Sequence, residues 1–223
     1  MQGDSPNVSY GPMQRDYRKL FYSDEAVCLM VPVTLAEGYG VLKAGTALAK
    51  NTSALTTGNK NKYVPYNPTS QAGTEDAPVR AYLRQGSTNS TSVHVGLLDS
   101  YKFKVGDDVI VDCSSLSGEN LGVIVSIDRT AYTDRAVIVA TTAVSGTGYT
   151  TALFSYLAVE GCDDCVGILG KSVDTGTGEK AAGAGASMLL SNYIIYTAGL
   201  INVDAAAIVD LSLVAHGQFT ICK

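Results

Sequence analysis

The runs that decide the fold class are Leu121-Gly122-Val123-Ile124-Val125-Ser126-Ile127-Asp128 and Ala136-Val137-Ile138-Val139-Ala140-Thr141-Thr142. Both are short and rich in β-branched residues, and a polar stretch separates them, which is typical of neighbouring β-strands. The run Val105-Gly106-Asp107-Asp108-Val109-Ile110-Val111 adds a third strand behind a Gly-Asp turn. With Tyr101-Lys102-Phe103 ahead of them, these runs predict a small curled sheet or β-barrel.

Two segments with the composition of linkers lie on either side of these strands. Residues 86–92 read GSTNSTS, and Gly146 and Gly148 follow the last strand. Flexible segments of this kind are common where one module is inserted into another. We therefore expect an inserted small β module over residues 99–150.

Short apolar runs separated by turn residues continue on both sides of this module and predict further short strands. The expected elements are strands at 26–31, 62–66, 79–83, 165–169, 188–196 and 217–221, a hairpin at 40–49, an exposed polar loop at 51–62, and a helix at 205–214. Pro65 would confine its strand to a sheet edge. The predicted class is mainly β: a short-stranded β-sandwich or β-tulip-like domain (26–98 and 151–223) that carries the inserted module and follows an extended N-terminal arm (1–25).

The composition excludes several classes of protein. Of 223 residues, 46% are hydrophobic and 17% are charged, which argues against a disordered chain. The net charge of −5 makes a nucleic-acid partner bound through a basic face unexpected. No apolar stretch is long enough for a membrane helix, and the first residues lack the apolar centre of a signal peptide. Five irregularly spaced cysteines favour a reduced, intracellular origin over a disulfide framework.

The first 25 residues differ from the rest. Pro6, Gly11 and Pro12 interrupt any regular element. Aromatic and basic side chains are concentrated there: Tyr10, Arg15, Tyr17, Arg18, Lys19, Phe21 and Tyr22. Such a segment cannot build its own core, and ordering it costs about 1–2 kcal/mol per residue in backbone entropy. It is either a frayed terminus or a docking arm that orders on a partner surface. The density of rings favours the arm, with those seven residues as its contacts.

Residues that could carry catalysis or bind a cofactor are sparse. Cys162 and Cys165 form a single C-x-x-C pair, whereas structural zinc needs four ligands. The two histidines, His94 and His216, lie in no nucleophile or metalloprotease motif, and the glycine-rich residues 174–180 lack the order of a phosphate-binding loop. Adjacent carboxylates such as Asp107 and Asp108 are more typical of turns. We expect no enzyme activity, no metal and no cofactor.

Several of these runs together resemble the head decoration, or capsid cement, proteins of tailed bacteriophages. The resemblance lies in Gly40-Val-Leu-Lys-Ala-Gly-Thr-Ala-Leu-Ala-Lys50, a polar loop, Lys62-Tyr-Val-Pro-Tyr66 and Arg80-Ala-Tyr-Leu83. Two later runs are similar to the family's strands: Cys165-Val-Gly-Ile-Leu169 and Val214-Ala-His-Gly-Gln-Phe-Thr-Ile221. The inserted module and the arm have no counterpart in the smallest members.

The resemblance implies a non-enzymatic structural protein on the outer surface of a phage capsid, made in the host cytoplasm. Its partner would be the major capsid protein, whose subunit contacts it would reinforce. We expect a homo-oligomer, dimer or trimer, with neither a nucleic-acid nor a membrane partner. One alternative is another virion component, such as a tail or fibre module that binds a host glycan. Another is a cytoplasmic enzyme, which would need His94 or His216 beside a carboxylate or thiol.

Overall fold

The computed structural model describes residues 29–68, 79–87, 89–113, 116–145, 148–151, 154–191, 193–214 and 219–222. Its strands are β1 (Leu29–Leu35), β2 (Val41–Leu42), β3 (Ala47–Lys50), β4 (Tyr63–Pro65), β5 (Ala81–Gln85), β6 (Ser92–Gly96), β7 (Asp108–Cys113), β8 (Leu116–Asp128), β9 (Arg135–Ala140), β10 (Tyr156–Val159), β11 (Cys165–Leu169), β12 (Val173–Asp174), β13 (Ala184–Ser191), β14 (Tyr193–Tyr196) and β15 (Phe219–Cys222). Its helices are α1 (Ala205–Val214) and the 3₁₀ turns η1 (Asp99–Lys102), η3 (Gly178–Lys180) and η4 (Thr197–Gly199).

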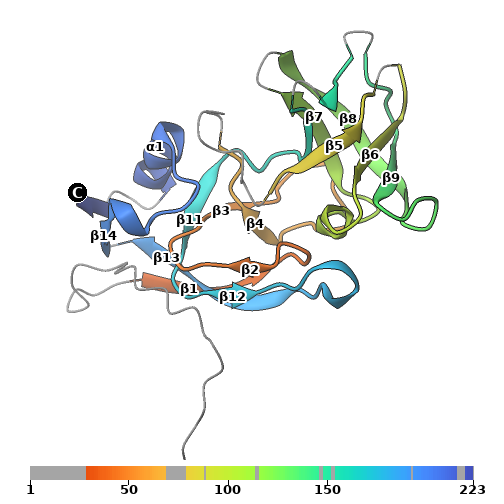
Figure 1. Ribbon diagram of the computed structural model, residues 1–223. Coiled ribbons are helices and arrows are strands. Elements are labelled where there is room, and N and C mark those ends of the chain that lie inside the picture. The colour runs from red at the N-terminus through yellow and green to blue at the C-terminus, as the bar shows by residue number, and fades with distance from the viewer. Residues whose placement is uncertain are drawn as a thin grey trace, which may run out of the picture.

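The strands form two closed barrels that lie side by side (Figure 1). The first barrel has the strand order β1-β13-β11-β3-β4, and a single parallel pair, Leu35 with Tyr63, closes it. Its interior is filled by fully buried aliphatic side chains, including Leu35, Leu48 and Leu189. Pro65 lies on β4 beside this closing seam, where a missing backbone donor costs least.

The second barrel has the order β10-β5-β6-β9-β8-β7, with β7 and β10 paired to close it. Its strands alternate between buried and partly exposed residues, as β9 shows most regularly, because one face of each strand points into the barrel. Val95, Ile138 and Leu157 are completely buried there. The mainly β class is therefore confirmed.

The second barrel is larger than the module predicted from the sequence. It takes strands from Ala81 to Val159, so the boundaries 99–150 are too narrow and the flanking ranges 26–98 and 151–223 are too wide. The GSTNSTS segment misled the prediction because it connects two strands of the same barrel, β5 and β6, which pair antiparallel. Sequence composition does not distinguish a hairpin connection from an interdomain linker.

Two local predictions in the first barrel are wrong. The expected hairpin at 40–49 does not form, because β2 pairs with β12 while β3 pairs with β4 and β11. The loop at 51–62 is not simply exposed: Asn51, Thr56 and Asn59 are buried. Both differences arise from partners distant in sequence, which local patterns do not reveal.

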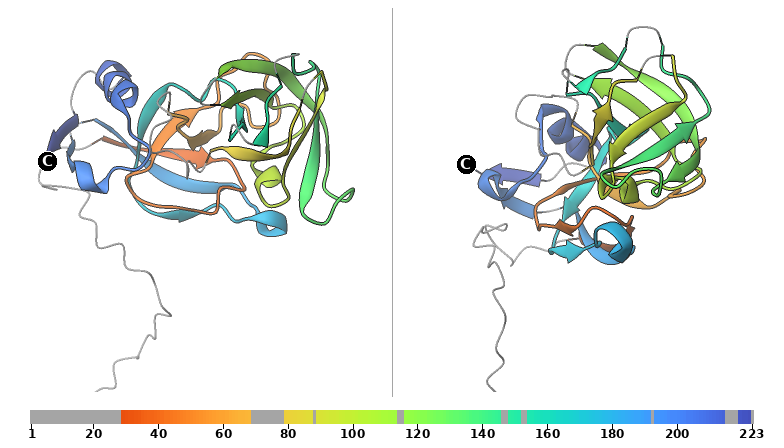
Figure 2. Two further views of the ribbon diagram at one scale, coloured as in Figure 1. Left: turned by 45° about the horizontal axis from the view of Figure 1, so that its top comes forward. Right: turned by 45° about the vertical axis from the view of Figure 1, so that its right-hand side comes forward.

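The last part of the chain matches its predicted elements closely. The helix α1 spans the expected residues and packs on β11, and the apolar run at 188–196 contributes to both β13 and β14. β15 covers most of the expected final strand and pairs in parallel with β14. Figure 2 shows α1, β14 and β15 at the end of the first barrel that lies away from the second barrel. Within the described residues, no helix is long and apolar enough to span a membrane.

Candidate functional site at the junction of the barrels

The two barrels are joined by a buried polar contact centred on Asp107. The loop between β3 and β4 brings Asn59 to the turn before β7. There the Asp107 carboxylate accepts hydrogen bonds from the backbone nitrogen of Asn59 (2.7 Å) and from its side-chain Nδ2 (2.9 Å). It also accepts one from the backbone nitrogen of Lys104 (2.8 Å). Burial raises the pKa of Asp107, and these hydrogen bonds partly oppose the rise. The carboxylate is therefore a structural acceptor.

The next residue extends the same contact. The Asp108 carboxylate accepts a hydrogen bond from Ser53 Oγ at 2.7 Å, and its backbone nitrogen donates to Thr56 Oγ1 at 3.0 Å. The Thr57 backbone nitrogen donates to the Gly106 carbonyl at 2.7 Å. Gly106 has a φ of +94°, and a Cβ there would collide with the Thr57 side chain. The loop and the turn thus fit each other closely and fix one barrel against the other.

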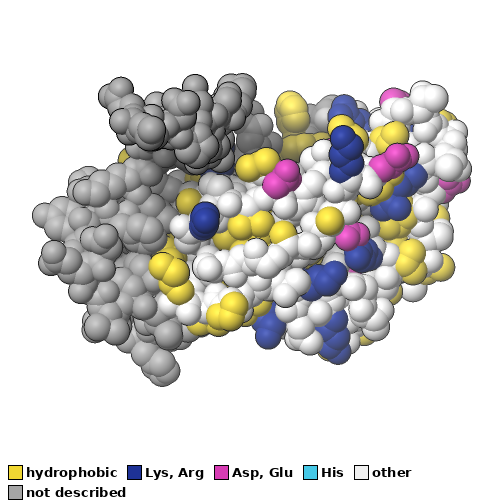
Figure 3. All heavy atoms as spheres, turned by 90° about the horizontal axis from the view of Figure 1, so that it is seen from below, with side chains coloured by type: hydrophobic (Ala, Val, Ile, Leu, Met, Phe, Trp, Pro, Cys, Tyr) yellow, Lys and Arg dark blue, Asp and Glu magenta, His cyan; other side chains and the backbone are white. Residues whose placement is uncertain are grey.

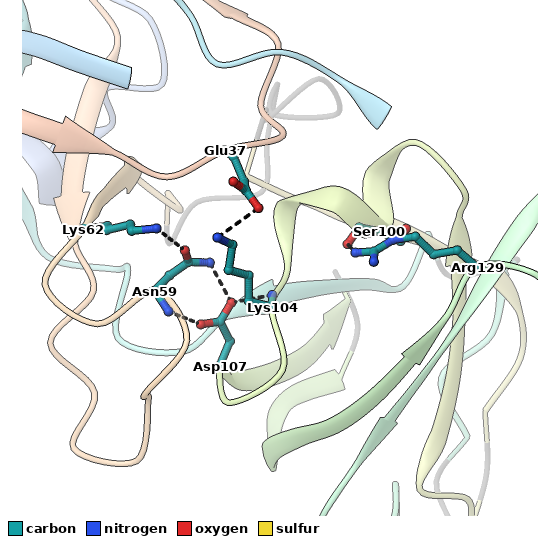
Figure 4. Close-up of polar contacts among 7 residues, drawn as sticks. All are labelled: Glu37, Asn59, Lys62, Ser100, Lys104, Asp107 and Arg129. Atoms are coloured by element: carbon teal, nitrogen blue, oxygen red, sulfur yellow. Dashed lines mark hydrogen bonds and ion pairs between the residues drawn. The ribbon is translucent and has the colours of Figure 1, made fainter. Parts of the chain in front are cut away.

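Beside this contact lies a cleft of about 480 Å³, lined by Glu37, Tyr101, Phe103, Lys104, Val105, Ile127, Arg129, Gly178, Glu179 and Ala181. Figure 4 shows how Lys104 reaches from the second barrel to Glu37 in the first, where the ammonium and carboxylate lie 3.0 Å apart. Lys62 donates to Asn59 Oδ1 at 3.2 Å. Burial and the neighbouring Lys104 lower the pKa of Lys62.

The other wall of the cleft is held by Arg129. Its Nε donates to Ser100 Oγ and its Nη2 to the Ser100 carbonyl, both at 2.9 Å (Figure 4). The guanidinium also lies 4.2 Å above the ring of Tyr101. Lys104 is paired with the Glu37 carboxylate, whereas Arg129 is held by the neutral Ser100 and the Tyr101 ring. The cleft therefore combines an ion pair and a guanidinium with aromatic and aliphatic side chains.

Figure 3 shows one face of the molecule, on which Lys and Arg side chains are spread among fewer Asp and Glu side chains and exposed hydrophobic groups. The charges are mixed on this face, and hydrophobic side chains lie between them.

A second cavity, of about 220 Å³, lies beside β10 and the turn that follows it, and is lined by Asn67, Pro68, Ile110, Asp112, Tyr156, Val159, Glu160, Gly161, Cys162 and Asp163. The Tyr156 hydroxyl donates to Asp112 at 2.9 Å, and the Arg80 guanidinium lies 4.2 Å above the tyrosine ring. Burial and the charges of Asp108 and Asp163 raise the pKa of Glu160. The cavity is smaller than the roughly 300–1,000 Å³ of typical ligand pockets.

The C-x-x-C pair lies beside this cavity. Cys162 and Cys165 are buried and unbonded to each other, and burial raises the pKa of both thiols, that of Cys165 to about 12. Both are therefore protonated at neutral pH and poorly nucleophilic. Among the described residues, no group of three or more His, Cys, Asp or Glu side chains could hold a metal ion.

His94 lies on β6 and lines neither of these cavities. Its ring packs against Tyr132, with the centroids 5.6 Å apart, and burial together with Arg135 lowers its pKa. The imidazole is therefore a packed, largely neutral side chain at pH 7. His216, the second histidine, lies outside the described residues.

All seven residues predicted as arm contacts also lie outside the described residues: Tyr10, Arg15, Tyr17, Arg18, Lys19, Phe21 and Tyr22. The structure instead reveals the junction and its cleft, which sequence reasoning missed. The sequence predicts a Gly-Asp turn at 106–107 and an exposed polar loop at 51–62. Nothing local indicates that they bind each other, because Asn59 and Asp107 are far apart in sequence.

Comparison with known proteins identifies no relative. No family model, no curated protein and no solved structure matches this chain.

Proposed function

We propose that this chain is a structural virion protein that binds the outer surface of a phage capsid and reinforces contacts between major capsid protein subunits. It acts by binding alone, without catalysis or a cofactor. Tyr10, Arg15, Tyr17, Arg18, Lys19, Phe21 and Tyr22 are the proposed contacts with the shell. The protein is made in the host cytoplasm and functions on the virion as a dimer or trimer.

The observation that carries the proposal is where the family-like runs lie in space. β3, β4 and β11 come from three of those runs, and they are neighbouring strands of the first barrel although β11 is far from the other two in sequence. The family-like runs thus form one continuous part of the first barrel's sheet, in which β3 pairs with both β4 and β11. Two other runs lie elsewhere, since the Arg80–Leu83 run contributes β5 of the second barrel and the final run contributes β15.

The buried junction supports the same function. A protein that reinforces a shell must transmit load between its contact points, which requires a body that does not bend between its two barrels. Asp107 and Asp108 are almost completely buried and link the barrels through hydrogen bonds, of which the bond from Asn59 to Asp107 is buried and the bond from Ser53 to Asp108 is partly buried. Binding of many copies to one shell would then convert weak single contacts into stable attachment.

The proposal is tested by co-sedimentation of the purified full chain with undecorated phage capsids of a matching host range. We expect the chain to pellet with the shells, and the variant Arg15→Ala/Arg18→Ala/Lys19→Ala to remain in the supernatant. A matched control removes three basic side chains elsewhere, Lys43→Ala/Lys60→Ala/Lys171→Ala, which are exposed on the first barrel. We expect this control to bind like the unmodified chain.

The outcomes separate the competing interpretations. If the full chain fails to bind shells but binds host glycans or cells, the tail or fibre alternative replaces the proposed function. If both triple variants bind as well as the unmodified chain, the role of the arm is wrong, although the capsid function remains.

A further inference from the structure

The turn at 59–62 brings an amine and an amide side chain together beside a buried carboxylate. The Lys62 backbone nitrogen donates to the Asn59 carbonyl at 3.1 Å and closes the turn. Lys62 Nζ lies 3.2 Å from Asn59 Oδ1, while Asn59 Nδ2 donates to Asp107 Oδ2 at 2.9 Å. Figure 4 shows Lys62 meeting the Asn59 side chain at its oxygen and Asp107 meeting it at its nitrogen.

These two contacts fix the orientation of the Asn59 amide. An ammonium group can only donate hydrogen bonds and an ionised carboxylate can only accept them, so Oδ1 must face Lys62 and Nδ2 must face Asp107. Asn59 is 1% exposed and Asp107 is completely buried. The amide carbon Cγ is therefore held next to a primary amine in a place from which most bulk water is excluded.

The charges around this amide favour a reaction between the amine and the amide. Burial and the neighbouring Lys104 ammonium lower the pKa of Lys62, which increases the fraction of uncharged, nucleophilic amine. Burial raises the pKa of Asp107, so this carboxyl takes up a proton more readily than an exposed aspartate does. The amine and the carboxyl are thus better matched for proton exchange near neutral pH.

We propose that Lys62 and Asn59 form an intramolecular isopeptide bond and that Asp107 carries the proton between the two nitrogens. The uncharged Lys62 amine attacks Asn59 Cγ with its lone pair, and the carbonyl electron pair moves onto Oδ1. Asp107 takes one proton from Nζ and delivers one proton to Nδ2. When the carbonyl re-forms, the Cγ–Nδ2 bond breaks and Nδ2 leaves as ammonia. A primary amine and a primary amide give a secondary amide and ammonia, so the reaction needs no oxidant and no activating group.

The position of Asp107 suits both proton transfers. It already contacts Nδ2, the atom that must be protonated before it can leave. After the attack, Nζ and Nδ2 are bonded to the same carbon, so a carboxylate that reaches one nitrogen lies close to the other. Because one turn and its neighbouring loop hold all three groups, the reaction avoids the entropy cost of bringing separate reactants together.

The bond would strengthen the junction between the barrels. It would close a covalent ring across residues 59–62 and so hold the turn that presents Asn59 to Asp107. The new amide keeps one N–H group, which can donate to Asp107 in place of Nδ2. The inference does not depend on the proposed function, and its test uses no capsid.

The bond is tested by mass spectrometry of the purified full chain. Loss of one ammonia molecule should make the intact mass about 17 Da lower than the mass of the sequence. Trypsin cleaves after unmodified lysine and arginine, so it should cut after Lys60 and Arg80 but not after the linked Lys62. We expect a branched product in which peptide 51–60 is joined through Asn59 to peptide 61–80.

Three variants identify the reacting groups, and each is compared with the mass of its own sequence. Lys62→Arg has no nucleophilic amine, and Asp107→Asn keeps the shape of the side chain but cannot carry the proton. We expect both variants to keep their full mass, with circular dichroism confirming that each is folded. The matched control Lys60→Arg changes an exposed lysine of the same turn and should lose ammonia as the unmodified chain does.

The outcomes that would overturn the proposal are equally specific. They are a full sequence mass for the unmodified chain, a loss of ammonia that maps to an unbranched peptide, and a loss that persists in Lys62→Arg. An unbranched peptide would show that a side chain has cyclised onto its own backbone. A cross-link that still forms in folded Asp107→Asn would overturn the role of Asp107 as the proton carrier.

Discussion

The two barrels are built in different ways. Three of the six neighbouring strand pairs of the second barrel are consecutive in sequence: β5 with β6, β7 with β8 and β8 with β9. The first barrel instead pairs strands from opposite ends of the chain, such as β1 with β13 and β3 with β11. More of the second barrel can therefore form from local contacts, whereas the first barrel depends more on bringing distant segments together.

The largest expected effect follows from this difference in construction. Leu189 is fully buried on β13, the strand between β1 and β11. We expect Leu189→Ala to reduce the free energy of unfolding by about 2–5 kcal/mol, because it removes packing and leaves a cavity. In urea unfolding followed by hydrogen exchange, the first barrel should lose protection before the second.

The matched control for this prediction is Leu98→Ala, since Leu98 is 64% exposed. Its free energy of unfolding should change by less than about 0.5 kcal/mol. Simultaneous loss of protection in both barrels of the Leu189 variant would show that they unfold as one unit, and the contrast between local and distant assembly would then have no consequence for stability.

The sequence predicts the locally paired strands better than the strands whose partners are distant in sequence. The β-branched runs at 121–128 and 136–142 predict β8 and β9 well, because hydrophobic alternation and nearby turns determine hairpins. Residues 40–49 are predicted to form a hairpin, but β2 pairs with β12 and β3 pairs with β11, both much later in the chain. Long-range pairing depends on which distant surfaces fit together, and a single sequence contains no direct record of it.

The candidate site was less predictable than the fold. The cleft depends on Glu37, Lys104 and Arg129, which come from a loop, a turn and the end of a strand. No spacing between these residues signals that they will meet. The N-terminal arm differs from the cleft, because its composition does carry a sequence signal for binding. Its seven proposed contact residues stay a prediction from the sequence.

The next prediction concerns the close fit between the barrels at Gly106. A Cβ at this positive φ would meet the Thr57 side chain, so Gly106→Ala should destabilise the protein by roughly 1–3 kcal/mol in thermal or urea unfolding. The control is Gly185→Ala on β13, where a Cβ meets nothing within 4 Å. Equal stability of the two variants would contradict a tightly fitted junction.

A smaller, pH-dependent effect is expected from Asp107. Burial raises its pKa in the folded protein above the unfolded value near 3.8, so the folded state holds the proton more readily. The stability that protonation contributes is present below the unfolded pKa and is lost as the pH rises through the higher folded pKa. The free energy of unfolding of the unmodified chain should therefore fall as the pH rises above about 4. The variant Asp107→Ser lacks the titrating carboxyl group, so its free energy of unfolding should not show this fall. An unchanged difference between the two proteins across this range would show that Asp107 is not titrating in the junction.

The smallest expected effect concerns the ion pair across the cleft. Glu37 and Lys104 are both partly exposed, so solvent screens their attraction. Glu37→Gln should lower the free energy of unfolding by no more than about 1 kcal/mol, and the difference should shrink further in high salt. A larger loss that salt does not reduce would mean that this pair, rather than the buried Asp107 contact, holds the barrels together.

The central claim is that this protein reinforces a shell, and the most direct measurement is calorimetry of undecorated capsids with and without it. A protein that binds the assembled shell and not its dissociated subunits must raise the shell's melting temperature, and more so at higher concentrations of the free protein. We predict this concentration-dependent rise for the full chain and its loss when residues 1–25 are deleted. A capsid melting temperature that stays constant at saturating concentrations of the full chain would contradict the account.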